Sequence, residues 1–126
     1  MTRKSKVIAT LGNSTDSILE KIVDGGADAV LIDTYYGEEE ENVSRIEKIK
    51  QLREKLNKNT AIIYDLDHIY AQSKYKLIKI EEESVDFACK HDVDFIACPF
   101  VSNIDEIRKV KDILTKKKKK DIGLIV

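Results

Sequence analysis

Short apolar runs alternate along this chain with stretches whose apolar residues recur every three or four positions. The apolar runs have the length of β-strands and lie at residues 6–12, 27–34, 60–67, 93–100 and 121–126. The stretches between them have helical periodicity. Strands that alternate with helices, and that are apolar on both faces, are typical of a parallel sheet covered by helices. The sequence therefore predicts an α/β fold with five parallel strands.

Local signals indicate where the helices begin and end. The stretch NSTD at residues 13–16 is rich in helix N-cap residues, and Gly25-Gly26 supplies the left-handed stop of a first helix. A second helix is expected from Glu38 to Asn57, because its acidic residues come first and its basic residues later. A third is expected from Glu81 to His91, and a fourth begins after Asn103 as its N-cap. Residues 68–80 fit a loop, a short strand or an extension of the third helix.

Composition excludes several classes of function. The 126 residues suit one domain, and 22 Lys and Arg against 23 Asp and Glu give a net charge of −1. This balance provides no attraction of the whole molecule to nucleic acid or to an acidic membrane. No apolar stretch approaches the roughly 20 residues that span a bilayer, and no signal peptide is recognisable. We therefore expect a cytoplasmic protein in which Cys89 and Cys98 are reduced core residues.

Two carboxylates come at the ends of predicted strands. Asp33 follows the second apolar run and Asp65 closes the third. The carboxyl ends of parallel strands gather on one rim, where α/β proteins place their active sites, and hard cations take carboxylate oxygens as ligands. An ion site at this rim is one interpretation. Capping of loops or helices by these aspartates is the other, and spacing alone favours it.

A run of five lysines precedes the last strand. Lys116, Lys117, Lys118, Lys119 and Lys120 would place positive charge at a helix C-terminus, which the helix dipole favours. Contact with RNA phosphates is the alternative. No aromatic residues are interleaved with the lysines to stack on bases. The solvated helix end is therefore the preferred interpretation.

The order of motifs resembles the amino-terminal part of pyruvate kinase. In the first half the resemblance is carried by the stretches KVIATLG, LEKIVDGGADAVLID, NVSRIEKIKQLREKL and AIIYDLD. In the second half it is carried by VDFACKHDVDFIACPFVSNIDEIRKVKDIL. It covers about residues 4–66 and 81–126. The resemblance implies a partial (β/α)8 barrel of about five strands, expected to be a single shortened domain over residues 1–126, with residues 67–80 in place of the lid domain.

The resemblance also implies that the phosphate-binding residues have been lost. Pyruvate kinases carry Arg-x-Asn-x-Ser-His-Gly at this strand end, where Arg holds a nucleotide phosphate and Asn and Ser help to bind potassium. The corresponding residues here are Leu31 to Gly37, without arginine. Asp65 matches the potassium-binding aspartate of the family, so Asp33 and Asp65 are expected to form a vestigial potassium site. A second family arginine falls near Gln72, and the family's catalytic Lys and metal-binding Glu correspond to positions just after Val126, so neither is expected among residues 1–126.

These departures predict a catalytically inactive protein that acts by binding another protein. We expect no catalytic residue and no cofactor, apart from potassium. The expected partner is a second copy of the chain or another protein, including full-length pyruvate kinase, which would cover the open edges of the barrel. The five tyrosines suit such a surface or fill the space left by the lid, and they are Tyr35, Tyr36, Tyr64, Tyr70 and Tyr75. The alternatives are a sensor of an ion or phosphorylated metabolite at the rim, or half of a split pyruvate kinase.

Overall fold

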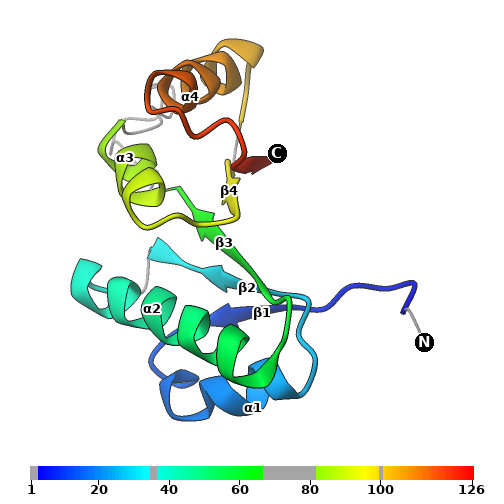
Figure 1. Ribbon diagram of the computed structural model, residues 1–126. Helices are drawn as coiled ribbons and strands as arrows, with labels where there is room; N and C mark the ends of the chain where they lie inside the picture. Colours follow the sequence, from blue (N-terminus) through cyan, green and yellow to red (C-terminus); the bar gives the residue numbers. More distant parts are fainter. Residues whose placement is uncertain (1–2, 35–36, 67–81, 100) are drawn as a thin grey trace. The chain divides into compact units, whose positions relative to one another are not determined.

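The computed structural model describes residues 3–34, 37–66, 82–99 and 101–126. Within these residues strands and helices alternate along the chain (Figure 1). The elements are β1 (Ile8–Leu11), the 3-10 helix η1 (Asp16–Ile18), α1 (Leu19–Asp24), β2 (Ala29–Ile32), α2 (Glu39–Leu56), β3 (Ala61–Asp65), α3 (Glu82–Lys90), β4 (Phe95–Ala97), α4 (Ile104–Lys116) and β5 (Gly123–Ile125).

The strands form one parallel sheet in the order β1-β2-β3-β4-β5. At one end Ile8 pairs with Ala29 and Leu11 with Ile32, and at the other Phe95 pairs with Gly123. Neighbours in the sheet are thus neighbours in the sequence. This order differs from that of doubly wound sheets, in which the strand order reverses at a switch point. The predicted α/β fold of parallel βα units is confirmed, and its winding is consistent with part of a (β/α)8 barrel.

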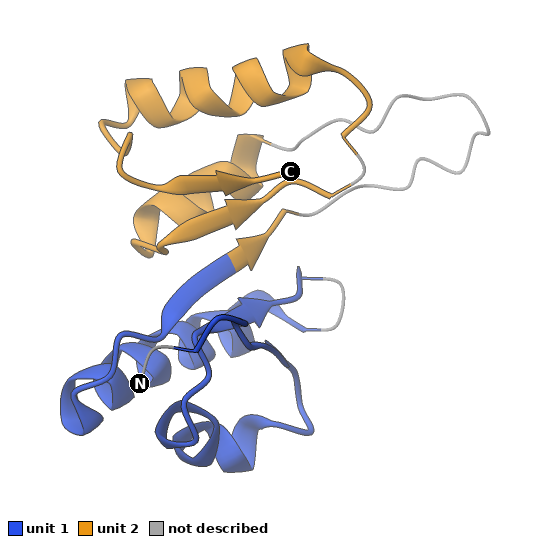
Figure 2. Ribbon diagram, turned by 90° about the vertical axis from the view of Figure 1, so that its right-hand side faces the viewer, with its two compact units in different colours: residues 1–63 blue, residues 64–126 orange. Residues whose placement is uncertain are grey.

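The chain divides into two compact units, Met1–Ile63 and Tyr64–Val126 (Figure 2). In the first unit α1 packs against α2, and α2 packs on β2. Its core is formed by side chains from β1, β2, the first part of β3 and both α-helices, namely Leu11, Leu19, Val23, Val30, Ile32, Ile46, Ile49, Leu52, Ile62 and Ile63. The periodicity of α2 places Ile46, Ile49 and Leu52 on its buried face.

The ends of α2 agree with the predicted span from Glu38 to Asn57. Glu38 is the N-cap, and its backbone N–H donates to Glu41 Oε2 at 3.0 Å in a capping box. Asn57 ends the helix in the left-handed conformation with φ 51°, which asparagine tolerates better than most residues. Local sequence signals therefore set both ends of this helix.

The first helical segment begins within NSTD as predicted, with η1 at Asp16, but without a side-chain cap. No side chain caps η1 or α1. The Thr15 hydroxyl instead donates to the Gly12 carbonyl at 2.8 Å and accepts from the Gly12 N–H at 2.9 Å. The hydroxyl therefore closes the loop after β1, because its hydrogen bonds are made with the backbone before the helix. Gly26, with φ 89°, does provide the predicted left-handed stop after α1.

The second unit is built from α3, α4 and the strands around them. The two helices pack against each other, and β4 pairs with β5. Asn103 caps α4 as predicted, accepting hydrogen bonds from the N–H groups of Asp105 and Glu106 at 3.0 and 3.2 Å. The core of this unit comprises Tyr64, Leu66, Val85, Ala88, Cys89, Val93, Ile96, Cys98, Val110, Ile113, Leu114 and Ile122.

β1 is less covered than a strand buried on both faces. Leu11 is buried, but Ile8 is 55% exposed and Val7, immediately before the strand, is 48% exposed. The expectation that helices cover every strand is therefore wrong for β1. Of the described helices, none combines the length and the apolar character that a membrane crossing needs.

Candidate functional site

Arg45 of α2 is the centre of a buried polar cluster in the first unit. Its side chain is only 3% exposed. Its Nε and Nη2 atoms donate to the two carboxylate oxygens of Asp16 at 2.7 and 2.8 Å. Nη2 also donates to Asn13 Oδ1 at 2.7 Å, and Nη1 donates to Asn42 Oδ1 at 3.1 Å. Arg45 therefore joins the loop after β1 to the N-terminal half of α2.

Electrostatics reinforces this cluster. The hydrogen bond from Arg45 lowers the pKa of the Asp16 carboxyl, and the effect exceeds the opposing effect of burial. The bond to Asp16 likewise raises the pKa of the Arg45 guanidinium. A planar guanidinium that meets a carboxylate through two parallel hydrogen bonds is among the strongest polar contacts in proteins. Arg45 and Asp16 are thus held in their charged forms.

Gly37 lies against the same guanidinium. A Cβ atom at residue 37 would be 2.8 Å from Arg45 Nη1 and 3.1 Å from Asn42 Oδ1. Real Cβ atoms do not approach a neighbouring atom this closely, and the guanidinium is fixed by its hydrogen bonds. The absence of a side chain at Gly37 therefore lets the segment after β2 approach the cluster.

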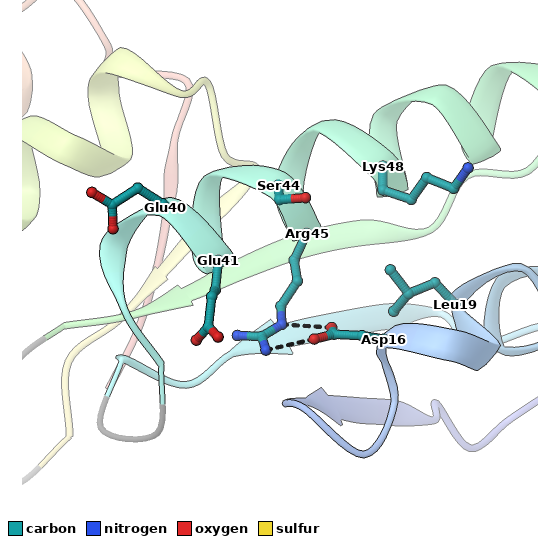
Figure 3. A pocket seen from close by; sticks show the side chains of 7 residues that line it. All are labelled: Asp16, Leu19, Glu40, Glu41, Ser44, Arg45 and Lys48. Atoms are coloured by element: carbon teal, nitrogen blue, oxygen red, sulfur yellow. Dashed lines mark hydrogen bonds and ion pairs between the residues drawn. The ribbon is translucent and has the colours of Figure 1, made fainter.

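An open pocket of about 500 Å³ lies beside the cluster (Figure 3). Figure 3 shows Arg45 directed at Asp16, with the Glu41 carboxylate on the side of the guanidinium and Lys48 extending away along α2. The lining residues come from η1, α1 and α2, and they are Asp16, Leu19, Glu40, Glu41, Ser44, Arg45 and Lys48. The pocket therefore has mixed charge, and its buried cation is already bound by protein oxygens.

This arrangement suits structural support better than phosphate binding. An anion would have to displace Asp16, Asn13 or Asn42 before it could reach the Arg45 guanidinium. Displacing them is costly, because the buried Arg45 guanidinium would lose charge-assisted hydrogen bonds that are already formed. Arg45 therefore positions the loop after β1 and is not an available phosphate ligand.

The two predicted rim aspartates lie at strand ends. Asp33 directly follows β2, and Asp65 is the last residue of β3. Both side chains are half-buried. Among the described residues, no group of three or more histidine, cysteine, aspartate or glutamate side chains is arranged to hold a metal ion. Ligation of potassium by Asp33 and Asp65 stays a prediction.

Several other residues that the sequence pointed to lie outside the part of the chain that the structure describes. Tyr35, Tyr36, Tyr70, Tyr75 and the 67–80 segment that was expected to replace the lid fall outside the described residues. The same is true of Asp67 and Gln72. Tyr64 is described, and it is a core residue with 4% exposure whose ring stacks on Phe87 at a centroid distance of 4.9 Å. Tyr64 therefore contributes to packing within the second unit and not to an exposed surface.

The lysine run begins at Lys116, the last residue of α4, and is partly paired. Lys117 forms an ion pair with Asp86 at 3.3 Å, and Lys119 pairs with Asp92. Lys118 adopts the left-handed conformation with φ 57°. Two of the five lysines thus contact acidic residues in and just after α3, which agrees with the structural interpretation of the run.

The two cysteines are free and buried, as predicted. Burial raises the pKa of the Cys89 thiol, and burial together with the nearby Asp65 carboxylate raises the pKa of Cys98 to about 11. Both thiols are therefore protonated at neutral pH. A protonated thiol is a poor nucleophile and a poor metal ligand, so the structural interpretation holds.

Sequence reasoning missed the Arg45 cluster. The available signal was spacing, since Asn42, Arg45 and Ile49 recur at intervals of three and four, in phase with the buried face of α2. A charged residue within an apolar stripe indicates a buried cation with partners. The prediction followed the apolar positions alone, so Arg45 was counted with the solvent-exposed charges.

Fold and site together define the class of this protein, a parallel βα protein of barrel-type winding with a buried arginine cluster beside its first strand-end loop. No protein-family model matches the chain. Individual proteins do match. Pyruvate kinase from Thermotoga maritima is 38% identical over 86 residues, which cover 67% of this chain and 18% of that enzyme. Pyruvate kinase from Haemophilus influenzae is 36% identical over 66 residues, and pyruvate kinase II from Salmonella typhimurium is 35% identical over 66 residues.

A part of this chain is therefore related to the pyruvate kinase family. The two matches over 66 residues cover 51% of this chain and 14% of each relative. The chain thus spans less than a fifth of the length of these curated relatives. The relationship bears out the resemblance in motif order along the matched part.

Proposed function

We propose that this chain is a catalytically inactive, pyruvate-kinase-like protein that acts by binding another protein. It would serve as an accessory or regulatory subunit, or as a factor on a larger assembly. The observation that carries this proposal is the engagement of Arg45. The guanidinium nearest the loop after β1 makes four hydrogen bonds to protein oxygens and has 3% exposure.

Leu31 supports the same proposal. The resemblance places the phosphate-holding arginine of the family at this position, where β2 carries an apolar side chain instead. Phosphoryl transfer depends on positioning and on stabilising charge, and one arginine that stabilises the transition state is worth ~10³–10⁵ in rate. A leucine here, with Arg45 fully bonded, leaves no cation from either position to hold a phosphate.

The exposed apolar strand β1 supports a role in binding. Ile8 and Val7 are about half exposed, whereas strands of parallel sheets are usually covered on both faces. We propose that the partner is the barrel of a pyruvate kinase. The exposed apolar side chains of Val7 and Ile8 would pack against the surface of that enzyme, which would cover this edge of the sheet. The cytoplasmic location predicted from the sequence is retained as part of this proposal.

A coupled assay of pyruvate formation tests inactivity. The purified chain is incubated with ADP, phosphoenolpyruvate, magnesium and potassium, with an active pyruvate kinase as the positive control. We expect no turnover above the rate without protein. Turnover by the chain alone would refute the proposal. Turnover that requires a second, individually inactive chain would support the split-enzyme alternative instead.

Binding is tested by mixing the chain with full-length pyruvate kinase from the same cell. We expect co-elution in size-exclusion chromatography and a changed pyruvate kinase rate. A chain that elutes at twice its own mass, with no effect on the enzyme, would indicate a homodimer. A monomer that leaves the enzyme unchanged would contradict binding to pyruvate kinase.

The alternative kept from the sequence is a sensor of potassium or of a phosphorylated metabolite, with the carboxylates of Asp33 and Asp65 as oxygen ligands. Isothermal calorimetry with potassium chloride and with phosphoenolpyruvate distinguishes it. Heat of binding that disappears in Asp65→Asn would support the sensor. The absence of heat with either ligand would eliminate it.

A further inference from the structure

The segment before β1 carries a serine between basic residues. Ser5 is exposed, and Arg3, Lys4 and Lys6 surround it in irregular, exposed backbone. Serine kinases modify extended, accessible segments, and a kinase whose substrate groove is acidic attracts flanking cations of this kind. The position is therefore accessible and electrostatically suited to such an enzyme.

Asp28 fastens this segment to the rest of the first unit. Its Oδ2 atom accepts a hydrogen bond from the Val7 backbone N–H at 2.8 Å and one from Arg3 Nη2 at 2.9 Å. Lys6 Nζ lies 3.7 Å from Oδ1, and Arg3 also donates to the Gly26 carbonyl. One carboxylate thus holds three residues of the segment that contains Ser5.

The charged form of Asp28 is stabilised by these contacts. The Val7 N–H lowers the pKa of the carboxyl most, and Arg3 and Lys6 lower it further against the effect of desolvation. The backbone of Asp28 also connects strand beginnings, because its N–H donates to Val7 and its carbonyl accepts from Ala61, each at 2.9 Å. Asp28 therefore contacts the basic segment through its carboxylate and the beginnings of two strands through its backbone.

We propose that Ser5 is a phosphorylation site for a serine kinase that selects basic flanking residues, and that its phosphate releases residues 3–7 from Asp28. In the reaction the Ser5 hydroxyl oxygen attacks the γ-phosphorus of a nucleoside triphosphate bound to the kinase. A new oxygen–phosphorus bond forms, and the bond from the γ-phosphorus to the β,γ-bridging oxygen breaks. The nucleoside diphosphate leaves with the electron pair, and the hydroxyl proton passes to the catalytic base of the kinase.

The phosphate acts on Asp28 in two ways. It carries about −1.5 to −2 charges at neutral pH, and it lies two residues from Arg3 and two from Val7, so it is within about 7 Å of each along the backbone. It therefore competes with Asp28 for Arg3 and Lys6, since it offers more charge and more acceptor oxygens. It also repels the Asp28 carboxylate. Both effects weaken the hydrogen bond from the Val7 N–H to Asp28.

Amide exchange at Val7 reports the release directly. The catalytic domain of protein kinase C and ATP are added to the full chain, and mass spectrometry locates the phosphate. We expect it on Ser5, with slower incorporation when Arg3 and Lys6 are both changed to Ala. In chain made with phosphoserine encoded at residue 5, the Val7 amide should exchange roughly tenfold faster, as expected for losing one hydrogen bond to a charged group.

Asp28→Asn is the matched variant. It removes the charge that the phosphate opposes, so its Val7 amide should exchange fast without phosphate and gain little from it. Failure of the kinase to modify Ser5 would overturn the site. Unchanged or slower exchange at Val7 in the phosphoserine chain would overturn the release. Neither readout depends on whether β1 binds a partner.

Discussion

At the scale of single residues, the Arg45 cluster should contribute measurably to the stability of the first unit. Most charges of the chain lie at the surface, where an ion pair contributes about 0–1 kcal/mol because water and salt screen it. Arg45 differs, since its side chain is 3% exposed while that of Asp16 is 43% exposed. The guanidinium has given up most of its water, and only protein oxygens replace it.

Replacement of Arg45 by Met should destabilise the first unit. The apolar chain of Met fills most of the volume, but Asp16, Asn13 and Asn42 lose their donor. Allowing for the partial exposure of Asp16, we expect a loss of about 2–4 kcal/mol in the free energy of unfolding. Urea denaturation measures it, with Lys48→Met, an exposed cation one turn later, as the control. A loss no larger than that of Lys48→Met would show that the cluster contributes little.

Acid should weaken the fold through Asp16. Arg45 lowers the pKa of Asp16 in the folded state, so the unfolded chain binds a proton at this residue more readily. The stabilisation is therefore complete above about pH 4, the ordinary pKa of aspartate, and is lost as pH falls through the folded value. Urea midpoints of wild type and Asp16→Asn at pH 6, 4 and 3 measure the effect. The difference between the two urea midpoints should decrease as the pH falls. A difference that stays constant would contradict the stabilisation of the fold by ionised Asp16.

At the scale of helices and strands, most boundaries were predictable because the determinants are local. Glu38, Asn57 and Asn103 carry capping chemistry that acts within four residues, and the structure places each at a helix end. The first helical segment also begins where it was predicted, but the Thr15 hydroxyl bonds to Gly12 and does not cap the helix. A short hydroxyl side chain suits both roles, and only the path of the loop decides between them.

The Arg45 cluster could not be predicted with equal ease. Its partners Asp16 and Asn13 are 29 and 32 residues away along the chain. No local rule connects residues at such separations. Asn42 lies three residues before Arg45 in the same helix, so it was the one partner that helical spacing could have indicated.

Asn103 should contribute measurably to α4. Its side chain accepts two N–H groups that the helix leaves unsatisfied, so Asn103→Ala should cost about 1 kcal/mol of stability. Asn103→Asp keeps the acceptor oxygen and should cost little, which makes it the control. Thermal unfolding of the two variants provides the comparison. Equal losses of stability in Asn103→Ala and Asn103→Asp would mean that water or the neighbouring Ser102 replaces the cap.

At the scale of the whole molecule, the sheet order and the relationship to pyruvate kinase agree. A parallel sheet of five strands was predicted from alternation, and the barrel-type strand order was implied by the resemblance to pyruvate kinase. What the sequence did not predict is the exposure of β1. Apolar residues such as Ile8 look identical in a covered and in an open strand, because coverage depends on tertiary neighbours.

Ile8 should therefore affect binding more than folding. Because its side chain is 55% exposed, Ile8→Lys should change the free energy of unfolding by less than about 1 kcal/mol. If β1 is the contact surface for a pyruvate kinase, the same change should abolish co-elution with the enzyme. Ile104→Lys, at a 64% exposed isoleucine of α4, is the matched control and should retain binding. Loss of binding in both variants, or in neither, would place the contact elsewhere.

The close approach of Gly37 to Arg45 also limits how this sequence can diverge. A methyl group at residue 37 and a guanidinium at residue 45 exclude each other in space. In a library randomised at both positions and selected for folded protein, side chains at 37 should survive only where 45 has become shorter. Residues 37 and 45 would then change together. A descendant sequence could gain a larger side chain at residue 37 only after it had lost the arginine at residue 45.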